Sequence, residues 1–123
     1  MMCALLSQPF IRAVFWSMCL TVLAGALAPQ ADAPQLFALA DKVVHTVAFG
    51  ALAVVGLRAY PKHRVIVCLL LVILGGLIEV FQGYTSSRSQ ELADFYADIV
   101  GVVLGCFAYQ LILRFRRKKR KNA

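Results

Sequence analysis

The sequence predicts an all-α fold, a polytopic membrane protein with a bundle of four transmembrane helices and both termini in the cytoplasm. The first observation is composition: 61 % of the 123 residues are hydrophobic and 15 % are charged, against about 45–50 % and about 25 % in soluble domains. A chain this short cannot bury so much apolar surface, which excludes a soluble globular monomer and a disordered chain. The other two observations are four apolar runs and an uneven division of charge between the polar breaks.

The apolar runs set the predicted helices. They cover residues 13–28, 43–57, 65–81 and 95–113, and each contains 15 to 19 residues. About 20 residues are needed to cross the hydrocarbon core, so flanking residues extend each helix into the interface. Because lipid offers the backbone no hydrogen-bond partner, these segments must be helical. We therefore predict one transmembrane domain over 1–123, with helices at about 11–28, 43–60, 65–82 and 94–113 and a basic cytoplasmic tail at 114–123.

The first apolar run has a second interpretation. Ala26-Leu27-Ala28 has the A-x-A form of a signal-peptidase site, and Ala31-Asp32-Ala33 is another candidate. However, Arg12 is the only basic residue that precedes the run, and small apolar residues are common in membrane helices. We expect the first helix to be retained.

The loops predict the orientation. With the N-terminus inside, 11 of the 13 basic residues and none of the six acidic residues lie on the inner side, as the positive-inside rule requires. Seven of these basic residues lie between Arg114 and Lys121, directly after the last apolar run. In that place a basic cluster anchors a helix and attracts anionic lipid headgroups. No nucleic-acid-binding pattern accompanies it, so membrane lipids are the expected partners and nucleic acid is not.

The four cysteines, Cys3, Cys19, Cys68 and Cys106, show no pairing pattern and no metal-ligand spacing. Three of them lie inside apolar runs, where cysteine behaves as a small hydrophobic residue. The sequence therefore predicts no metal site and no cofactor.

Polar residues recur at intervals of three and four within the last three helices. An ionisable group inside a membrane helix costs about 2.5–3.5 kcal/mol and therefore needs a partner or a purpose. At 100° per residue, each set forms one stripe on its helix. The stripes are Asp41 and His45; then Gly75, Glu79 and Gln82; then Asp94, Asp98, Gly101 and Gly105.

The last two helices run antiparallel, which predicts how their stripes meet. Matching depths pairs Gln82 with Asp94, Glu79 with Asp98, and Gly75 with Gly101, with His45 at a similar depth. Gly101 and Gly105 are expected to face the helix that carries Gly75, because close approach needs small residues. The result is a polar pocket about one helical turn inside the outer surface. Lys42 and Arg88, the two outer basic residues, would balance its carboxylates or bind an anionic headgroup.

These residues resemble motifs of the VanZ-like membrane proteins. Asp41-Lys42-Val43-Val44-His45 resembles the family's D-K-x-x-H, Glu79-Val80-Phe81-Gln82 its E-x-x-Q, and Arg88 followed by Asp94 its R-x5-D. The resemblance spans residues 41 to about 110, and Gly101 and Gly105 match the family's last helix. One position departs, because the family often has Asn where this chain has Asp98. The family is named for a member linked to teicoplanin resistance, so the resemblance implies an envelope function in the bacterial cytoplasmic membrane.

Three functional hypotheses follow. The first is binding of an anionic lipid or a lipid-linked cell-envelope precursor, with or without a role in glycopeptide resistance. The second is a membrane-embedded enzyme acting on such a lipid, with His45, Glu79 and Asp98 as catalytic candidates and with or without a divalent metal. The third is a structural or assembly subunit in which the polar cluster only locks the bundle. The candidate ligand-binding residues are Asp41, Lys42, His45, Glu79, Gln82, Arg88, Asp94 and Asp98.

Overall fold

The computed structural model describes residues 7–28, 36–84 and 92–123. They form four helices, α2 (Gln8–Leu27), α3 (Leu36–Ala59), α4 (Arg64–Tyr84) and α5 (Leu92–Lys121), and these ranges contain no strand. Each helix contains a stretch long and apolar enough to cross a membrane. The predicted all-α class and the four candidate spans are confirmed.

All four helices extend beyond the apolar runs that predicted them. Helix α2 begins at Gln8, and Pro9 occupies its first turn, where proline's missing N–H costs nothing. Helix α3 begins at Leu36, so Asp41 lies inside the helix rather than ahead of it. Helix α5 continues to Lys121, so most of the predicted tail is helical. Lysine and arginine are good helix formers, and their charges are favourable at a helix C-terminus.

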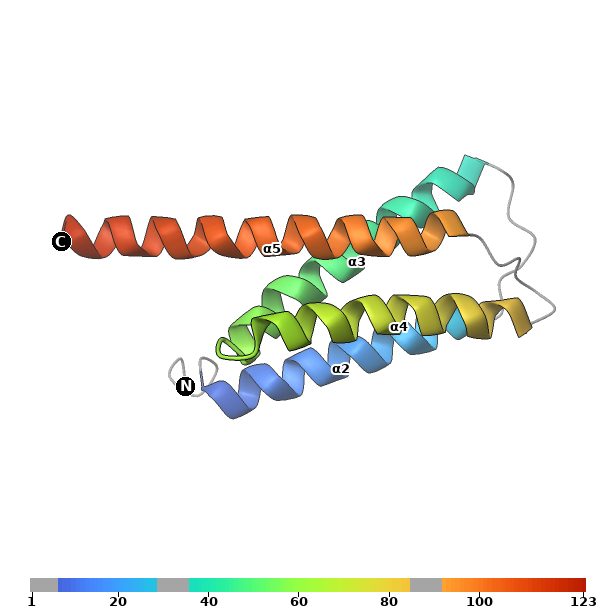
Figure 1. Cartoon of the computed structure of the whole chain (residues 1–123), viewed down its shortest axis with the longest axis horizontal. Helices are drawn as coiled ribbons and strands as arrows, with labels where there is room; N and C mark the ends of the chain where they lie inside the picture. The colour runs from blue at the N-terminus through green and yellow to red at the C-terminus, as the bar shows by residue number, and fades with distance from the viewer. Residues whose placement is uncertain (1–6, 29–35, 85–91) are drawn as a thin grey trace.

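Helix α3 is the centre of the bundle. It packs against each of the other three helices and most extensively against α5. In Figure 1 it crosses the bundle diagonally, while α2 and α4 lie side by side and the described chain ends are at the same end of the long axis. The first turns of α3 and α5 therefore meet at the opposite end of the molecule from the last turn of α5.

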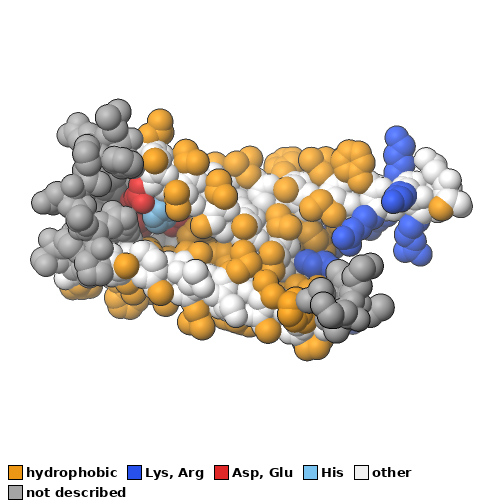
Figure 2. Space-filling view, turned by 180° about the vertical axis from the view of Figure 1, so that it is seen from behind, with side chains coloured by type: hydrophobic (Ala, Val, Ile, Leu, Met, Phe, Trp, Pro, Cys, Tyr) orange, Lys and Arg blue, Asp and Glu red, His pale blue; other side chains and the backbone are white. Residues whose placement is uncertain are grey.

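Charge divides the bundle into two ends. We call the end that holds Asp41, Asp94 and Asp98 the polar end, and the end that holds Arg58 and Arg64 the basic end. Figure 2 shows acidic and histidine side chains together at one end and basic side chains gathered toward the other, with apolar side chains between. This distribution is the one expected of helices that cross a bilayer.

The apolar core lies between α3 and its neighbours. Phe49 and Leu52 of α3 and Ile78 of α4 are fully buried. Large apolar side chains also cover the outer surface of the bundle, including Val65 and Phe107, which are 72 % and 68 % exposed. An exposed apolar surface on every helix suits contact with lipid and not with water.

Aromatic contacts join α2 to the end of α3 at the basic end. Trp16 Nε1 donates a hydrogen bond to Tyr60 Oη over 2.9 Å, and the rings of Phe15 and Tyr60 meet edge to face. The Arg12 guanidinium lies 4.9 Å from the centre of the Tyr60 ring. Tyr60 therefore fixes the start of α2 against the end of α3 through both its ring and its hydroxyl group.

Glycines bring α5 into backbone contact with α3. A Cβ atom at Gly105 would lie 2.5 Å from Gly50 O and 2.6 Å from Ala53 Cβ, and one at Gly101 would overlap Thr46 O. The prediction that these two glycines face the helix with Gly75 is therefore wrong. Their partner is a second stripe of small residues on α3, Thr46, Gly50 and Ala53, whose spacing of four and three permits close approach.

Candidate functional site

The centre of the polar end is a buried pair that joins α3 to α5. His45 Nδ1 lies 2.8 Å from Asp98 Oδ1, where the imidazole N–H donates to the carboxylate. The two residues are 8 % and 1 % exposed. Thr46 supports the same contact, since its hydroxyl group lies 2.9 Å from Lys42 O in its own helix and 3.3 Å from Ala97 O in α5. The close approach at Gly101 is what allows these side chains to meet across the helix interface.

A second pair lies one turn closer to the end of the bundle. Lys42 Nζ is 3.7 Å from Asp94 Oδ1, with side chains 31 % and 8 % exposed. Lys42 therefore makes the carboxylate contact expected of it, while part of its side chain reaches the surface. Arg88, the other basic residue predicted for this site, lies outside the described residues.

Asp41 completes the group on α3. Its Oδ1 atom lies 4.0 Å from His45 Nε2, on the side of the ring opposite to the Asp98 contact. One donor atom each from Asp41, His45 and Asp94 lies within 4.8 Å of the others, a spacing that could hold a metal ion. The sequence predicted no metal site, and this cluster was missed because Asp94 lies far from Asp41 and His45 along the chain. The Asp41–His45 spacing was the available signal.

Helix α4 contributes Glu79 and Gln82, which are 3 % and 1 % exposed. Gln82 Nε2 donates to Ala26 O in α2 over 2.9 Å, a partner that the sequence did not predict. Opposite Asp98 lies Gly75, where a Cβ atom would be 2.9 Å from Asp98 Oδ2. The predicted pairing of Gly75 with Gly101 is wrong, because the Asp98 side chain lies beside Gly75 and Gly101 lies against α3. The pairings of Glu79 with Asp98 and of Gln82 with Asp94 stay predictions.

Two cysteines that the sequence left unpaired also meet between α4 and α5. Cys68 Sγ and Cys106 Sγ lie 3.4 Å apart, and both thiols are free. Cys68 is seven residues before Gly75, hence on the same face of α4. That shared face was the signal for this contact, which lies nearer the basic end and does not belong to the polar cluster.

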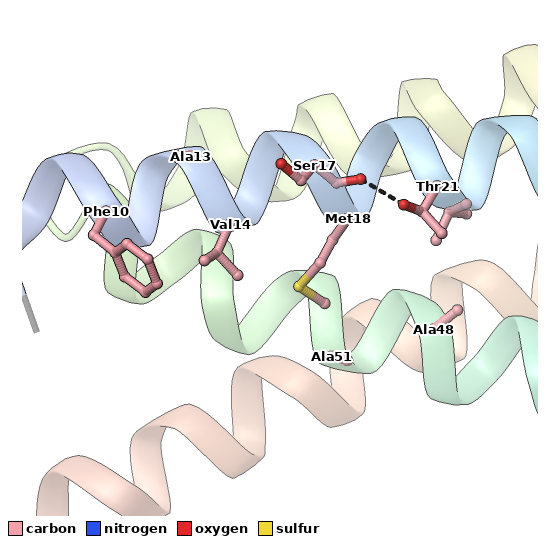
Figure 3. A pocket seen from close by; sticks show the side chains of 9 residues that line it. Phe10, Ala13, Val14, Ser17, Met18, Thr21, Ala48 and Ala51 are labelled. Atoms are coloured by element: carbon pink, nitrogen blue, oxygen red, sulfur yellow. Dashed lines mark hydrogen bonds between the residues drawn. The ribbon is translucent and has the colours of Figure 1, made fainter. Parts of the chain in front are cut away.

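An apolar groove opens between α2 and α3. Its volume is about 540 Å³, and Figure 3 shows side chains of both helices along it. The Thr21 hydroxyl group donates to Ser17 O over 2.8 Å within α2. Its hydrogen atom is therefore not available to a ligand in the groove. Ala48 lines it three residues from His45. The full lining is Phe10, Ala13, Val14, Ser17, Met18, Thr21, Val22, Ala48 and Ala51.

The described part of the polar end combines four carboxylates with one lysine and one histidine. Such a set has the chemistry to hold a cation, to exchange protons through the imidazole, or to bind a polar headgroup through the lysine. Compared with protein-family models, curated proteins and solved structures, the chain matches none of them.

Proposed function

We propose that this chain is a VanZ-like protein of the bacterial cytoplasmic membrane that binds the polar head of an anionic lipid or lipid-linked envelope precursor at its polar end. The observation that carries the proposal is the burial of His45 and Asp98, with Lys42 and Asp94 beside them, between two membrane-spanning helices. Ionisable groups in such a place are costly and are usually functional. The motifs at 41–45, 79–82 and 88–94 are the reason for the family assignment.

Two further features support a lipid as the ligand. Lys42 is partly exposed and its 3.7 Å ion pair is long, so its ammonium group has room to contact a phosphate oxygen as well as Asp94. The apolar groove between α2 and α3 includes Ala48, three residues from His45, and would accommodate part of a hydrocarbon chain. A ligand with both a charged head and an apolar tail matches this combination.

The proposal places the polar end at the outer face of the membrane. In a variant without native cysteines, we expect an impermeant maleimide added to intact cells to label Ser86→Cys and to leave Lys118→Cys unlabelled. The physical reason is the concentration of basic residues at the opposite end. Labelling of Lys118→Cys without Ser86→Cys would place the site in the cytoplasm and contradict the proposal.

Retained lipid tests the binding directly. We expect native mass spectrometry of the protein, released from gentle detergent, to show a bound phospholipid or polyprenyl phosphate. Lys42→Ala should reduce the bound fraction several-fold, because it removes the described cation of the site. Lys62→Ala is the matched control, since Lys62 is exposed at the basic end. Equal retention by both variants, or no retained lipid in the unmodified protein, would count against the proposed function.

Two other functions have an observation in their favour. The 2.8 Å contact between His45 and Asp98 is the geometry of a general base oriented by a carboxylate, which favours an enzyme acting on the same lipid. The same contact joins the closely packed α3 and α5, which favours a purely structural role in holding these helices together. Chemical change of the retained lipid during incubation would indicate the enzyme, and its complete absence would indicate the structural role.

A further inference from the structure

The geometry points to a divalent cation site formed by Asp41, His45 and Asp94 at the polar end. We propose that these three side chains bind a first-row divalent cation, Zn²⁺ or Mn²⁺. Two helices supply the ligands, Asp41 and His45 from α3 and Asp94 from α5, and their donor atoms lie within 4.8 Å of one another. This proposal stands apart from the proposed function, because no lipid is needed for the cation to bind.

The orientation of His45 is the first argument. Its Nδ1 atom is engaged by Asp98 Oδ1 at 2.8 Å, so the other ring nitrogen, Nε2, is directed toward Asp41. Within residues 7–28, 36–84 and 92–123, Nε2 forms no hydrogen bond, since Asp41 Oδ1 is 4.0 Å away. The side chain is 8 % exposed. A metal-bound histidine commonly donates its second N–H to a carboxylate, as His45 does here, and presents a lone pair to the ion.

Charge is the second argument. Asp41, Asp94 and Asp98 lie around His45, and Lys42 forms an ion pair with Asp94. A dication between Asp41 and Asp94 would be attracted electrostatically by both carboxylates. Lys42 contacts Asp94 Oδ1, so an ion bound at that carboxylate would compete with the ammonium group. The Lys42 side chain is 31 % exposed, and that exposure leaves it a path toward water.

The donor types and their spacing select the kind of cation. One imidazole nitrogen with two carboxylate oxygens suits Zn²⁺ or Mn²⁺ better than Cu⁺, which prefers sulfur, or Ca²⁺, which prefers oxygen alone. A cation about 2.0–2.2 Å from each donor would hold the donors roughly 3–3.5 Å apart. The His45 Nε2 to Asp41 Oδ1 distance of 4.0 Å therefore has to shorten slightly. Rotation of the Asp41 side chain, which is 33 % exposed, is sufficient for this movement.

The test uses the full chain in detergent, stripped with EDTA and then titrated with Mn²⁺ or Zn²⁺. Loss of the free Mn²⁺ signal in electron paramagnetic resonance and the rise in melting temperature with either metal report binding. We expect one ion per chain and a loss of affinity of at least about tenfold in Asp41→Asn, and again in Asp94→Asn. His63→Ala is the control, because His63 is exposed at the basic end and is not in the ligand set.

Each outcome decides the proposal. Asp41 is partly exposed, so Asp41→Asn should fold, and its melting temperature without metal verifies this. Stoichiometric binding that Asp41→Asn and Asp94→Asn weaken and His63→Ala preserves would support the site. No binding of either metal at millimolar concentration, or equal affinity in all variants, would overturn it. Because the titration contains no lipid ligand, metal binding without retained lipid would remove the proposed function and leave the cation site standing.

Discussion

Replacing Asp98 by alanine is expected to destabilise the bundle by about 3–5 kcal/mol, because it leaves the buried imidazole of His45 without its partner. His45 is 8 % exposed and Asp98 is 1 % exposed, so water cannot take the place of the lost carboxylate. The measurement is the free energy of unfolding in detergent, followed by circular dichroism during denaturation. His45→Ala is expected to destabilise by a similar amount for the same reason.

Two controls show whether this loss comes from the pair. Asp98→Asn keeps an oxygen that accepts from His45 Nδ1 and removes the charge, so we expect it to be nearly neutral or stabilising. His63→Ala removes the chain's other histidine, which is exposed in the turn between α3 and α4, and should change stability by less than about 0.5 kcal/mol. If Asp98→Ala behaved like His63→Ala, the buried pair would not be holding α3 to α5.

The conservative variants also separate a working site from a structural lock. Asp98→Asn and Glu79→Gln preserve shape and most hydrogen bonding, so both should fold. Under the proposed function they are expected to lose lipid retention and the cellular phenotype, measured as envelope stress or glycopeptide susceptibility. Under the structural alternative both would be silent. An unchanged phenotype with unchanged or higher stability would end the functional interpretation of these two residues.

Adding one methyl group at Gly105 is expected to destabilise the bundle by about 1–3 kcal/mol. The new Cβ would lie 2.5 Å from a backbone oxygen, Gly50 O, and 2.6 Å from Ala53 Cβ, so neither neighbour is a flexible side-chain end. Helices α3 and α5 would have to separate, which would also weaken the contacts of His45. The measurement is the unfolding free energy of Gly105→Ala in detergent.

The same substitution elsewhere gives the opposite expectation. A Cβ at Gly25 in α2 would meet no atom within 4 Å. Gly25→Ala should therefore be neutral or stabilising by up to about 1 kcal/mol, because alanine has the higher helix propensity. A loss of stability at Gly25 equal to that at Gly105 would contradict the packing of α5 on α3.

The polar cluster was partly predictable from single helices. Asp41 and His45 are one turn apart on one stripe, and Asp94 and Asp98 repeat that spacing, so their convergence followed from helical periodicity. The contacts between helices were harder to predict from the sequence. Periodicity shows which residues share a face of a helix, but it does not show how that helix is rotated against its neighbour. The contact of Asp98 with the position of Gly75 and the hydrogen bond from Gln82 to α2 are two examples.

The sequence by itself determined that the chain is four apolar helices with its charge divided between two ends, since burial cost and helical periodicity act within each segment. Only the tertiary structure decided that α3 is the central helix and that Gly101 and Gly105 lie against it. Small-residue stripes on α3 and α4 were both possible partners for α5, and the choice between them depends on how all four helices share one core. The cation geometry at His45 follows from that choice, because only the α3–α5 contact brings Asp94 to Asp41.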